Sequence, residues 1–344
     1  MSISIYHNHY TPYPNQNNPV GQTPKTPVGQ TPKTPGMTNT KKPFIHPKWH
    51  KTYIKTTYIQ HTYTTNAMSL TTTHNAGFFS CCSIKLNNIT DYFNAYSKLP
   101  DHVDSSIQFE WYKTQQEKHR DITYEYFEHY NNIQIQPETI RHPIHYCFDH
   151  QFMDYSTLDY TMIPIIKKYF SPSKQIIDMI DHFRDRYQID YDNVCVLYYR
   201  GNDKITETPL CDYDEYLIYA TRVLKHQPNI TFLIQSDETE FIEFMTNQFP
   251  HNSIILKDHI RHINKCKSSV DIMMPEKNYE YSKYYLAITI IMSKCKYIIC
   301  NSGNCSKWIM LYRGSGKNMC QFLQGKVFNQ IPDPPTDPDP TPDH

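Results

Sequence analysis

The run of residues from Val194 to Lys204 constrains the fold more than any other stretch of this 344-residue chain. Six apolar or aromatic residues, Val194–Tyr199, give way abruptly to the polar segment Arg200–Lys204. A continuous apolar run with this ending is typical of a buried parallel strand that delivers polar residues at the carboxyl edge of a sheet. Ligands of open α/β sheets bind at that edge. Because Arg200 and Lys204 bring two cations there, we expect a phosphate-bearing ligand.

Apolar strands and amphipathic helices alternate throughout this half of the chain. Short apolar runs predict strands at residues 194–199, 230–234, 253–256 and 296–300. Apolar residues at helical spacing predict helices at residues 213–224, 241–249, 284–292 and 308–312. A polar segment at 262–277 is expected to form an ordered insertion or lid. Repeated β-α units of this length predict an α/β fold with a parallel, doubly wound sheet and right-handed crossovers.

The preceding part of the chain predicts a separate α/β domain over residues 59–188, followed by a second domain over 189–329. A short strand is expected at 70–73, leading into a loop at 74–80 that opens a helix with its apolar face between Ile84 and Tyr96.

Two further elements are predicted in this first domain. Residues 107–111 alternate between apolar and polar, as a half-buried strand does. Ser171 and Pro172 predict the N-cap and first turn of a helix that extends to Tyr187. We expect this helix to cross from the first domain to the second.

Both ends of the chain have the composition of disordered segments. Residues 1–58 form a polar, Pro-rich arm in which the octapeptide at 19–26 is repeated at 27–34, and residues 330–344 alternate Pro and Asp. Frequent prolines exclude helix and sheet, so we expect extended or disordered chain. The lysines of the arm could tether a partner, or the arm could be a plain spacer.

Composition excludes several classes of function. The formal net charge is zero, which argues against nucleic acid as a partner. The chain shows no signal peptide and no apolar segment approaching the roughly 20 residues that span a bilayer, so we expect no membrane insertion and a cytoplasmic location. The 10 cysteines lack zinc-ligand spacing and are expected to be reduced, buried thiols, with no metal bound. Walker and G-x-G-x-x-G loops are absent from the sequence, which argues against a phosphoryl-transfer ATPase or a dinucleotide enzyme.

Three polar clusters follow predicted strands, at residues 200–204, 236–238 and 301–306. Because they share one sheet edge, they can converge on one ligand, although strand-to-helix loops are often polar for other reasons.

Individual residues of these clusters allow two interpretations. Asp237 could accept from a ribose or a base edge, or it could be the N-cap of the next helix. The 301–306 loop could hold an anion on its backbone N–H groups, or it could be an ordinary helix start capped by Asn304 or Ser306. Asp203 could orient Arg200 or pair with Lys204.

These motifs resemble a known family. The segment Tyr198–Lys204, with Glu207 soon after it, resembles the arginine segment, roughly H-x-R-x-x-D, of GDP-fucose-dependent fucosyltransferases, the superfamily of α1,6-fucosyltransferase, NodZ and protein O-fucosyltransferase. Residues 236–238 are similar to the T-D-D segment of that family, and residues 300–306 to its C-x-S-S-x-x-S region. The loop at 77–80 lies where those enzymes carry a Gly-rich loop.

The resemblance implies a GT-B architecture with two Rossmann-like domains facing a cleft. It implies an inverting, metal-independent glycosyltransferase that uses no cofactor and transfers fucose, or a related sugar, from GDP-fucose or a similar nucleotide sugar to a glycan or glycoprotein acceptor. Arg200 would be catalytic and would stabilise the leaving pyrophosphate. The implied donor-binding residues are Tyr198, Gly201, Asn202, Asp203, Lys204, Glu207, Ser236, Asp237, Ser302, Gly303, Asn304 and Ser306. The implied acceptor or cleft loop consists of Gly77, Phe78, Phe79 and Ser80.

The sequence also departs from the family pattern. Tyr198 stands where relatives have His, and the helix at 284–292 lacks an acid that relatives often carry. Asp203 and Glu207 are the candidates for a general base. The departures leave open a catalytically lapsed, glycan-binding or structural protein of the same fold. An unrelated hydrolase or kinase would need a nucleophile or phosphate loop that the sequence lacks.

Overall fold

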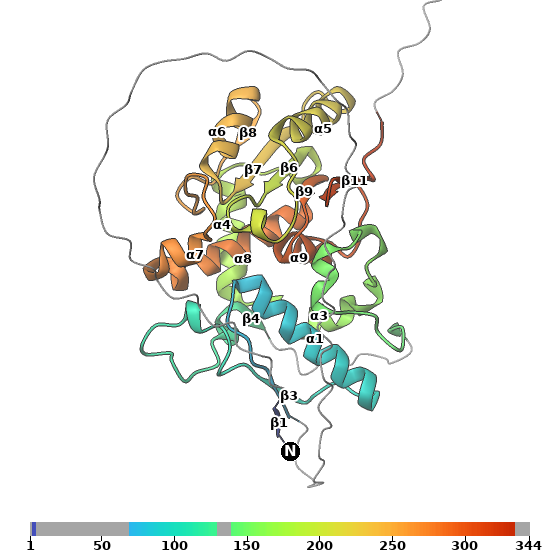
Figure 1. Ribbon diagram of the computed structural model, residues 1–344, viewed down its shortest axis with the longest axis vertical. Coiled ribbons are helices and arrows are strands. Elements are labelled where there is room, and N and C mark those ends of the chain that lie inside the picture. The colour runs from blue at the N-terminus through green and yellow to red at the C-terminus, as the bar shows by residue number, and fades with distance from the viewer. Residues whose placement is uncertain (1, 5–68, 129–138, 334–344) are drawn as a thin grey trace, which may run out of the picture. The chain divides into compact units, whose positions relative to one another are not determined.

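The computed structural model describes residues 2–4, 69–128 and 139–333 (Figure 1). These residues all belong to one compact unit, so the predicted boundary between residues 188 and 189 stays a prediction. The Pro-rich repeats lie outside the described residues, and so does the C-terminal Pro/Asp tail beyond residue 333.

A six-stranded sheet in the order β11-β10-β9-β6-β7-β8 forms the centre of the fold. Its strands are β6 (Val194–Tyr199), β7 (Thr231–Ser236), β8 (Ser253–Ile254), β9 (Tyr297–Asn301), β10 (Met319–Leu323) and β11 (Lys326–Asn329). The strands from β8 to β10 are parallel, and β11 pairs antiparallel with β10. All four strands predicted in this half are present, and β6 has the predicted bounds.

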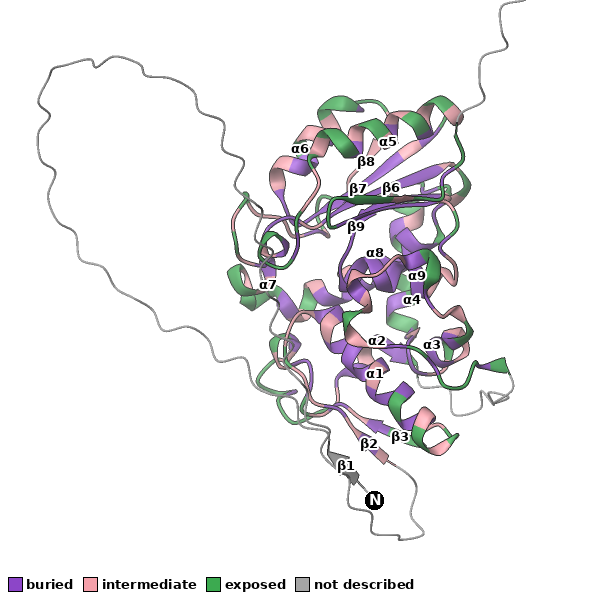
Figure 2. Ribbon diagram, turned by 45° about the vertical axis from the view of Figure 1, so that its right-hand side comes forward, coloured by how far each residue is buried: buried purple, intermediate pink, exposed green. Residues whose placement is uncertain are grey.

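Helices cover both faces of this sheet. The helices are α4 (Lys174–Arg186), α5 (Tyr213–His226), α6 (Thr239–Gln248), α8 (Asn278–Lys294) and α9 (Asn304–Arg313). Figure 2 shows α5 and α6 on one face and α4, α8 and α9 on the other. The predicted α/β fold with a parallel, doubly wound sheet is therefore confirmed. The short helix α7 (Val270–Met273) lies within the predicted 262–277 insertion. No helix in the described ranges is long and apolar enough to cross a bilayer.

The N-terminal half is built around helix α1. A small parallel sheet has the order β1-β2-β3, and the antiparallel pair β4-β5 lies apart from it. The elements of this half are β1 (Ser2–Ser4), β2 (Ser69–Thr71), α1 (Phe78–Tyr96), β3 (His102–Asp104), α2 (Thr123–Tyr126), β4 (Phe127–Glu128), α3 (Ile163–Tyr169) and β5 (Ser171–Pro172). Strand β1 differs from the expectation of an arm without sheet structure, because these three residues precede all the prolines of the arm.

Two predictions in this half are wrong. The strand expected at 107–111 does not form, because Phe109 has a left-handed backbone (φ 61°) and residues Glu110–Tyr112 turn into a 3-10 helix. The strand that pairs with β2 is β3, which precedes the predicted 107–111 strand in the chain. Ser171 is not the N-cap of α4, because Ser171–Pro172 pairs with β4 as strand β5. The cap is Ser173, whose hydroxyl accepts from the N–H of Ile176 at 3.4 Å.

Buried contacts between α1 and α9 join the two halves. Trp308 of α9 is fully buried, and its ring lies 6.1 Å from that of Phe79. Its indole N–H donates to the hydroxyl of Ser83 at 3.0 Å, and that hydroxyl bonds the side-chain oxygen of Asn304 at 2.8 Å. These bonds fix the start of α9 against α1, and this contact sets the geometry of the site described next.

Candidate functional site

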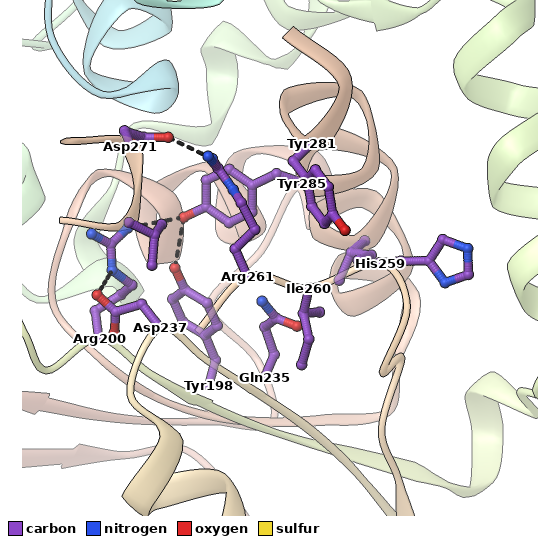
Figure 3. Close-up of a pocket in the computed structure, with 12 residues that line it drawn as sticks. Tyr198, Arg200, Gln235, Asp237, His259, Ile260, Arg261, Asp271, Tyr281 and Tyr285 are labelled. Atoms are coloured by element: carbon purple, nitrogen blue, oxygen red, sulfur yellow. Dashed lines mark hydrogen bonds and ion pairs between the residues drawn. The ribbon is translucent and has the colours of Figure 1, made fainter. Parts of the chain in front are cut away.

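Arg200 follows β6 directly and lies at the carboxyl edge of the sheet. Its Nε donates to Oδ2 of Asp237 at 3.0 Å, and its Nη2 donates to Oδ1 of Asp203 at 2.9 Å. Its Nη1 donates to the hydroxyl of Tyr285 at 3.2 Å, as Figure 3 shows. A guanidinium has more N–H donors than these three bonds use, so Arg200 retains donors for an anion.

The backbone around Arg200 is held by the neighbouring strands. Asn301, the last residue of β9, accepts from the N–H of Arg200 at 3.0 Å and donates to its carbonyl oxygen at 2.7 Å. Asp237 also accepts from the N–H of Gly201 at 3.0 Å. The amide of Asn202 donates to the carbonyl oxygen of Asp237 and accepts from the N–H of Cys266 at 2.8 Å. The loop that carries Arg200 is therefore fixed by hydrogen bonds to its neighbours. The Asn202 side chain makes two of these bonds.

Burial and charge together set the protonation states in this cluster. Burial alone would lower the pKa of Arg200, but Asp237 and Asp203 outweigh it and raise the pKa well above its ordinary value. Burial alone would raise the pKa of Asp203, but attraction to Arg200 and Lys204 lowers it. At Asp237 burial dominates and raises the pKa, with Arg200 opposing. Arg200 therefore stays a cation at every physiological pH.

A cavity of about 300 Å³ opens beside Arg200. Both halves of the chain line it. The predicted site residues among its walls are Gly77, Phe78, Phe79, Ser80, Arg200, Asp203, Lys204, Glu207, Gly303, Asn304 and Ser306. The structure thus brings the cleft loop of the N-terminal half together with two of the three polar clusters of the C-terminal half.

Two helix N-termini reach this cavity. Helix α1 contributes Gly77–Ser80, and helix α9 contributes Gly303–Ser306. The first N–H groups of a helix have no acceptor within the helix, and the helix dipole adds partial positive charge there. Both effects favour an anion, and phosphate groups commonly bind at such positions. The alternative of a helix start capped by Asn304 or Ser306 is wrong, because the N-cap of α9 is Gly303 and makes no side-chain cap.

Lys204 adds a second cation to the cavity wall. Its ammonium pairs with the carboxylate of Glu207, and its side chain is only 10% exposed. The Glu207 side chain is 38% exposed. Glu207 is therefore the more accessible member of this ion pair.

A second, narrower cavity lies on the other side of Arg200. Its walls are Tyr198, Arg200, Gln235, Asp237, His259, Ile260, Arg261, Val270, Asp271, Tyr281, Tyr285 and Ile288. Arg200, Asp271 and Tyr285 line both cavities. The hydroxyl of Tyr198 lies 2.9 Å from that of Tyr285, so the Tyr198 side chain is bonded within this wall. Asp237 is not the N-cap of α6, because that position is Glu238.

Four predicted residues line neither cavity: Gly201, Asn202, Ser236 and Ser302. Ser236 is fully buried, and its hydroxyl accepts from the N–H of Glu238 at 3.0 Å. Ser302 bonds the carbonyl oxygen of Phe322 at 3.1 Å and the amide of Gln321 at 2.8 Å. Both hydroxyls stabilise the backbone of strand ends, so neither is presented to a ligand in this geometry.

Several residues of the site were not anticipated from the sequence. Asp271 pairs with Arg261 at 2.6 Å and accepts from the hydroxyl of Tyr112 at 3.0 Å, which links the 262–277 segment to the N-terminal half. Tyr285 and the 40%-exposed Trp111 line the larger cavity. Asp271 and Tyr285 do not end a predicted strand, and the strand expected to end at Trp111 does not form. The expectation that ligands bind at the carboxyl ends of strands therefore did not single out these residues.

The described residues contain no group of three or more His, Cys, Asp or Glu side chains that could hold a metal ion. All ten cysteines are free, and those in strands and helices of the core are buried. Burial raises the pKa of the Cys300 thiol, which disfavours the thiolate. These cysteines therefore behave as small apolar core residues.

Comparison with known proteins gives distant structural similarity. No family model and no curated protein matches the chain. The NodZ alpha-1,6-fucosyltransferase soaked with GDP-fucose aligns with a TM-score of 0.49 and 11% identity, over 78% of this chain and 100% of that chain. Fucosyltransferase NodZ from Bradyrhizobium aligns with a TM-score of 0.46 and 10% identity, over 79% of this chain and 100% of that chain.

The chain is similar in structure to fucosyltransferases. A mutant of Arabidopsis thaliana FUT1 in complex with GDP also aligns, with a TM-score of 0.30 and 9% identity, over 47% of this chain and 35% of that chain.

Proposed function

We propose that this chain is a glycosyltransferase that binds a nucleotide sugar, GDP-fucose or a related donor, in the cavity beside Arg200. The observation that supports this most is the convergence of two helix N-termini, Arg200 and Lys204 on one cavity. A diphosphate is the ligand group best matched to it, because it needs several N–H donors and fixed positive charge.

Arg200 is proposed to stabilise the leaving group. When the bond between the anomeric carbon and the β-phosphate oxygen breaks, negative charge develops on that oxygen. A cation fixed in advance lowers the barrier because it needs no reorganisation at that moment. The bonds of Arg200 to Asp237, Asp203 and Tyr285 supply this fixation. Attack of an acceptor hydroxyl from the opposite face would invert the anomeric centre, without a metal ion.

Glu207 is the better placed of the two candidates for a general base. Asp203 is bonded to Arg200, and its lowered pKa makes it a weak proton acceptor. Glu207 lines the cavity and is more exposed, although it pairs with Lys204. The acceptor, a glycan or glycoprotein, would enter past the cleft loop Gly77–Ser80 and Trp111.

Donor hydrolysis and transfer in the Arg200→Lys variant test this proposal. Lysine keeps the charge, so Asp237 is not left unpaired, but it loses the fork of donors. We expect a loss of turnover on the order of a hundredfold. Arg222→Lys, at an exposed position on α5, is the control and should keep wild-type turnover. Unchanged turnover in Arg200→Lys would remove Arg200 from the mechanism.

A second candidate is a lapsed transferase that binds the nucleotide sugar or a glycan without turnover. It is favoured by the charge balance of the site, since both cations are already paired with carboxylates. GDP binding together with no donor hydrolysis and no transfer to a panel of glycan acceptors would support this candidate.

A further inference from the structure

The two most exposed large apolar side chains of the described residues are neighbours on helix α7. Ile272 is 59% exposed and Met273 is 57% exposed. The inner side of this short helix is held by the protein, because Val270 is buried and Asp271 pairs with Arg261 at 2.6 Å. Figure 2 shows α7 at the periphery of the described part of the chain. Helix α7 therefore displays two apolar side chains to solvent from a fixed backbone.

A third exposed apolar side chain joins them from the N-terminal half. Trp111 is 40% exposed. The residue after it, Tyr112, donates from its hydroxyl to Asp271, the residue before Ile272, at 3.0 Å. Trp111 and Ile272 both line the larger cavity, whereas Met273 lines neither cavity. These three side chains thus form one exposed apolar patch, which begins at the mouth of the larger cavity and extends beyond it.

Exposed lysines accompany this patch. The segment 264–277, which carries α7, has three exposed lysines, Lys265, Lys267 and Lys277, and one exposed acid, Glu276. Within the described residues Lys267 and Lys277 form no ion pair, and Lys265 lies 3.6 Å from the buried Glu238. The exposed charge of this segment is therefore positive, although the formal net charge of the whole chain is zero.

We propose that the patch of Trp111, Ile272 and Met273, together with the lysines of segment 264–277, docks on the surface of a membrane that contains anionic lipids. Tryptophan and aliphatic side chains enter the boundary between headgroups and acyl chains, and lysines are attracted to anionic headgroups. Docking of this kind needs no spanning helix. Because the patch begins at the larger cavity, docking brings the mouth of that cavity to the bilayer.

The size and position of the patch favour a membrane over other occupants. A stable protein interface buries about 800 Å² on each partner, and three side chains supply only a small part of such an area. A ligand of the larger cavity alone would contact Trp111 and Ile272 but would leave Met273 exposed. A membrane surface covers all three side chains and also matches the charge of the lysines.

Flotation of the full chain with lipid vesicles tests the proposal. Wild type should bind vesicles of phosphatidylcholine mixed with phosphatidylserine, and should bind pure phosphatidylcholine several-fold more weakly. Met273→Asp should lose about tenfold in affinity for the mixed vesicles, because it places a negative charge in the patch. Ile218→Asp is the matched control: Ile218 is 52% exposed but lies on α5, so this variant should bind as wild type does.

A second pair of variants tests the charge of the patch. Lys277→Glu should weaken binding to the mixed vesicles several-fold, whereas Lys225→Glu, at an exposed position on α5, should not. Neither Met273 nor Lys277 lines either cavity, so both variants should keep the wild-type melting temperature and the wild-type affinity for GDP. Brominated lipids should quench tryptophan emission in wild type and much less in Trp111→Phe.

The outcomes separate this inference from the function proposed above. Absence of wild-type binding to the mixed vesicles overturns the inference, and so does an equal loss of binding in Met273→Asp and Ile218→Asp. Equal binding of wild type to the two kinds of vesicle overturns the choice of an anionic surface. Titration of GDP without vesicles judges the proposed function separately, since a failure to bind GDP leaves vesicle binding unchanged.

Discussion

The hydroxyl of Tyr155 contacts both backbone polar atoms of Gly303, the N-cap residue of α9. It accepts from the N–H of Gly303 at 2.9 Å and lies 2.9 Å from its carbonyl oxygen. It also lies 2.8 Å from the carbonyl oxygen of Gln151, so one phenolic proton is shared between two acceptors. A fully buried side chain from the N-terminal half thus orients a helix N-terminus of the proposed diphosphate site.

We predict that Tyr155→Phe lowers both stability and GDP affinity. The substitution leaves the Gly303 N–H without its acceptor, which should cost about 1–3 kcal/mol in the free energy of unfolding. GDP affinity should fall several-fold because the start of α9 loses its support. Urea unfolding and calorimetry measure the two effects. Tyr160→Phe is the control: its hydroxyl bonds the carbonyl oxygen of Tyr155 at 2.7 Å, and its loss should lower stability but leave GDP affinity intact.

Gly201 in the Arg200 loop and Gly77 in the wall of the larger cavity should respond differently to alanine. A Cβ at Gly201 would lie 1.9 Å from Oε2 of Glu238, a fully buried side chain with little room to move. A Cβ at Gly77 would have only Oδ2 of Asp271 as a neighbour, at 4.0 Å. We predict a loss of about 1–3 kcal/mol for Gly201→Ala and under about 1 kcal/mol for Gly77→Ala. Equal unfolding free energies of the two variants would contradict this description of the Arg200 loop.

Lys307 should make stability rise with pH. Its ammonium is fully buried on α9, 3.2 Å from the carbonyl oxygen of Phe148, and burial lowers the pKa of Lys307 from 10.5 to about 7. Between these values the unfolded chain binds a proton that the folded chain does not, so stability increases across pH 7 to 10.5. The melting temperature of wild type should therefore rise relative to that of Lys307→Met as pH increases. Lys326→Met, at an exposed site on β11, should follow wild type at every pH.

The ion pair between Glu125 and Lys283 should be lost in acid. Lys283 Nζ lies 2.8 Å from Glu125 Oε2, and this pair joins α8 to α2. The hydroxyl of Tyr279 also donates to Glu125 at 2.8 Å. Burial alone would raise the pKa of Glu125, but these two partners outweigh it and lower the pKa below its ordinary 4.5. The stabilisation is therefore complete above pH 4.5 and disappears as pH falls through the lower, folded-state pKa.

The variant Glu125→Gln should melt below wild type at neutral pH, and the difference should vanish in strong acid. The exposed pair of Lys174 and Asp178, whose charged atoms lie 2.7 Å apart, supplies the control. Asp178→Asn should shift the melting temperature little at any pH, because solvent screens exposed pairs. A Glu125→Gln difference that is constant with pH would show that the charge of Glu125 contributes nothing.

Periodicity predicted the C-terminal half well because each element there has an unambiguous pattern. The apolar run 194–199 has only one interpretation next to charged residues, and it matches β6. Short elements were harder. Residues 107–111 alternate as a strand does, but the left-handed backbone at Phe109 leads into a 3-10 helix instead. Periodicity did not predict the hairpin of β10 and β11. The structure shows that its turn residues Gln324 and Gly325 both have positive φ, as tight hairpins require.

The site was predictable where it follows strand ends and not where it depends on tertiary contacts. Arg200 and Asp203 were expected there because they follow β6 in sequence. Asp271 comes from the short helix α7 and Tyr285 from the interior of α8, and only the packing of these helices brings them to Arg200. Ser236 has the predicted position on β7, but its side chain bonds the adjacent backbone. Local hydrogen bonds of this kind decide where a side chain points at a strand end. The spacing of residues in the sequence does not reveal these bonds.

The affinity of GDP relative to GMP, in wild type and Arg200→Lys, tests the central claim most directly. The two nucleotides differ only in the β-phosphate, so their ratio isolates the group that Arg200 and the helix N-termini are proposed to bind. We predict that wild type binds GDP at least about tenfold more tightly than GMP and that Arg200→Lys loses most of this ratio. Equal affinities for GDP and GMP in wild type, or an unchanged ratio in the variant, would contradict a diphosphate site at Arg200.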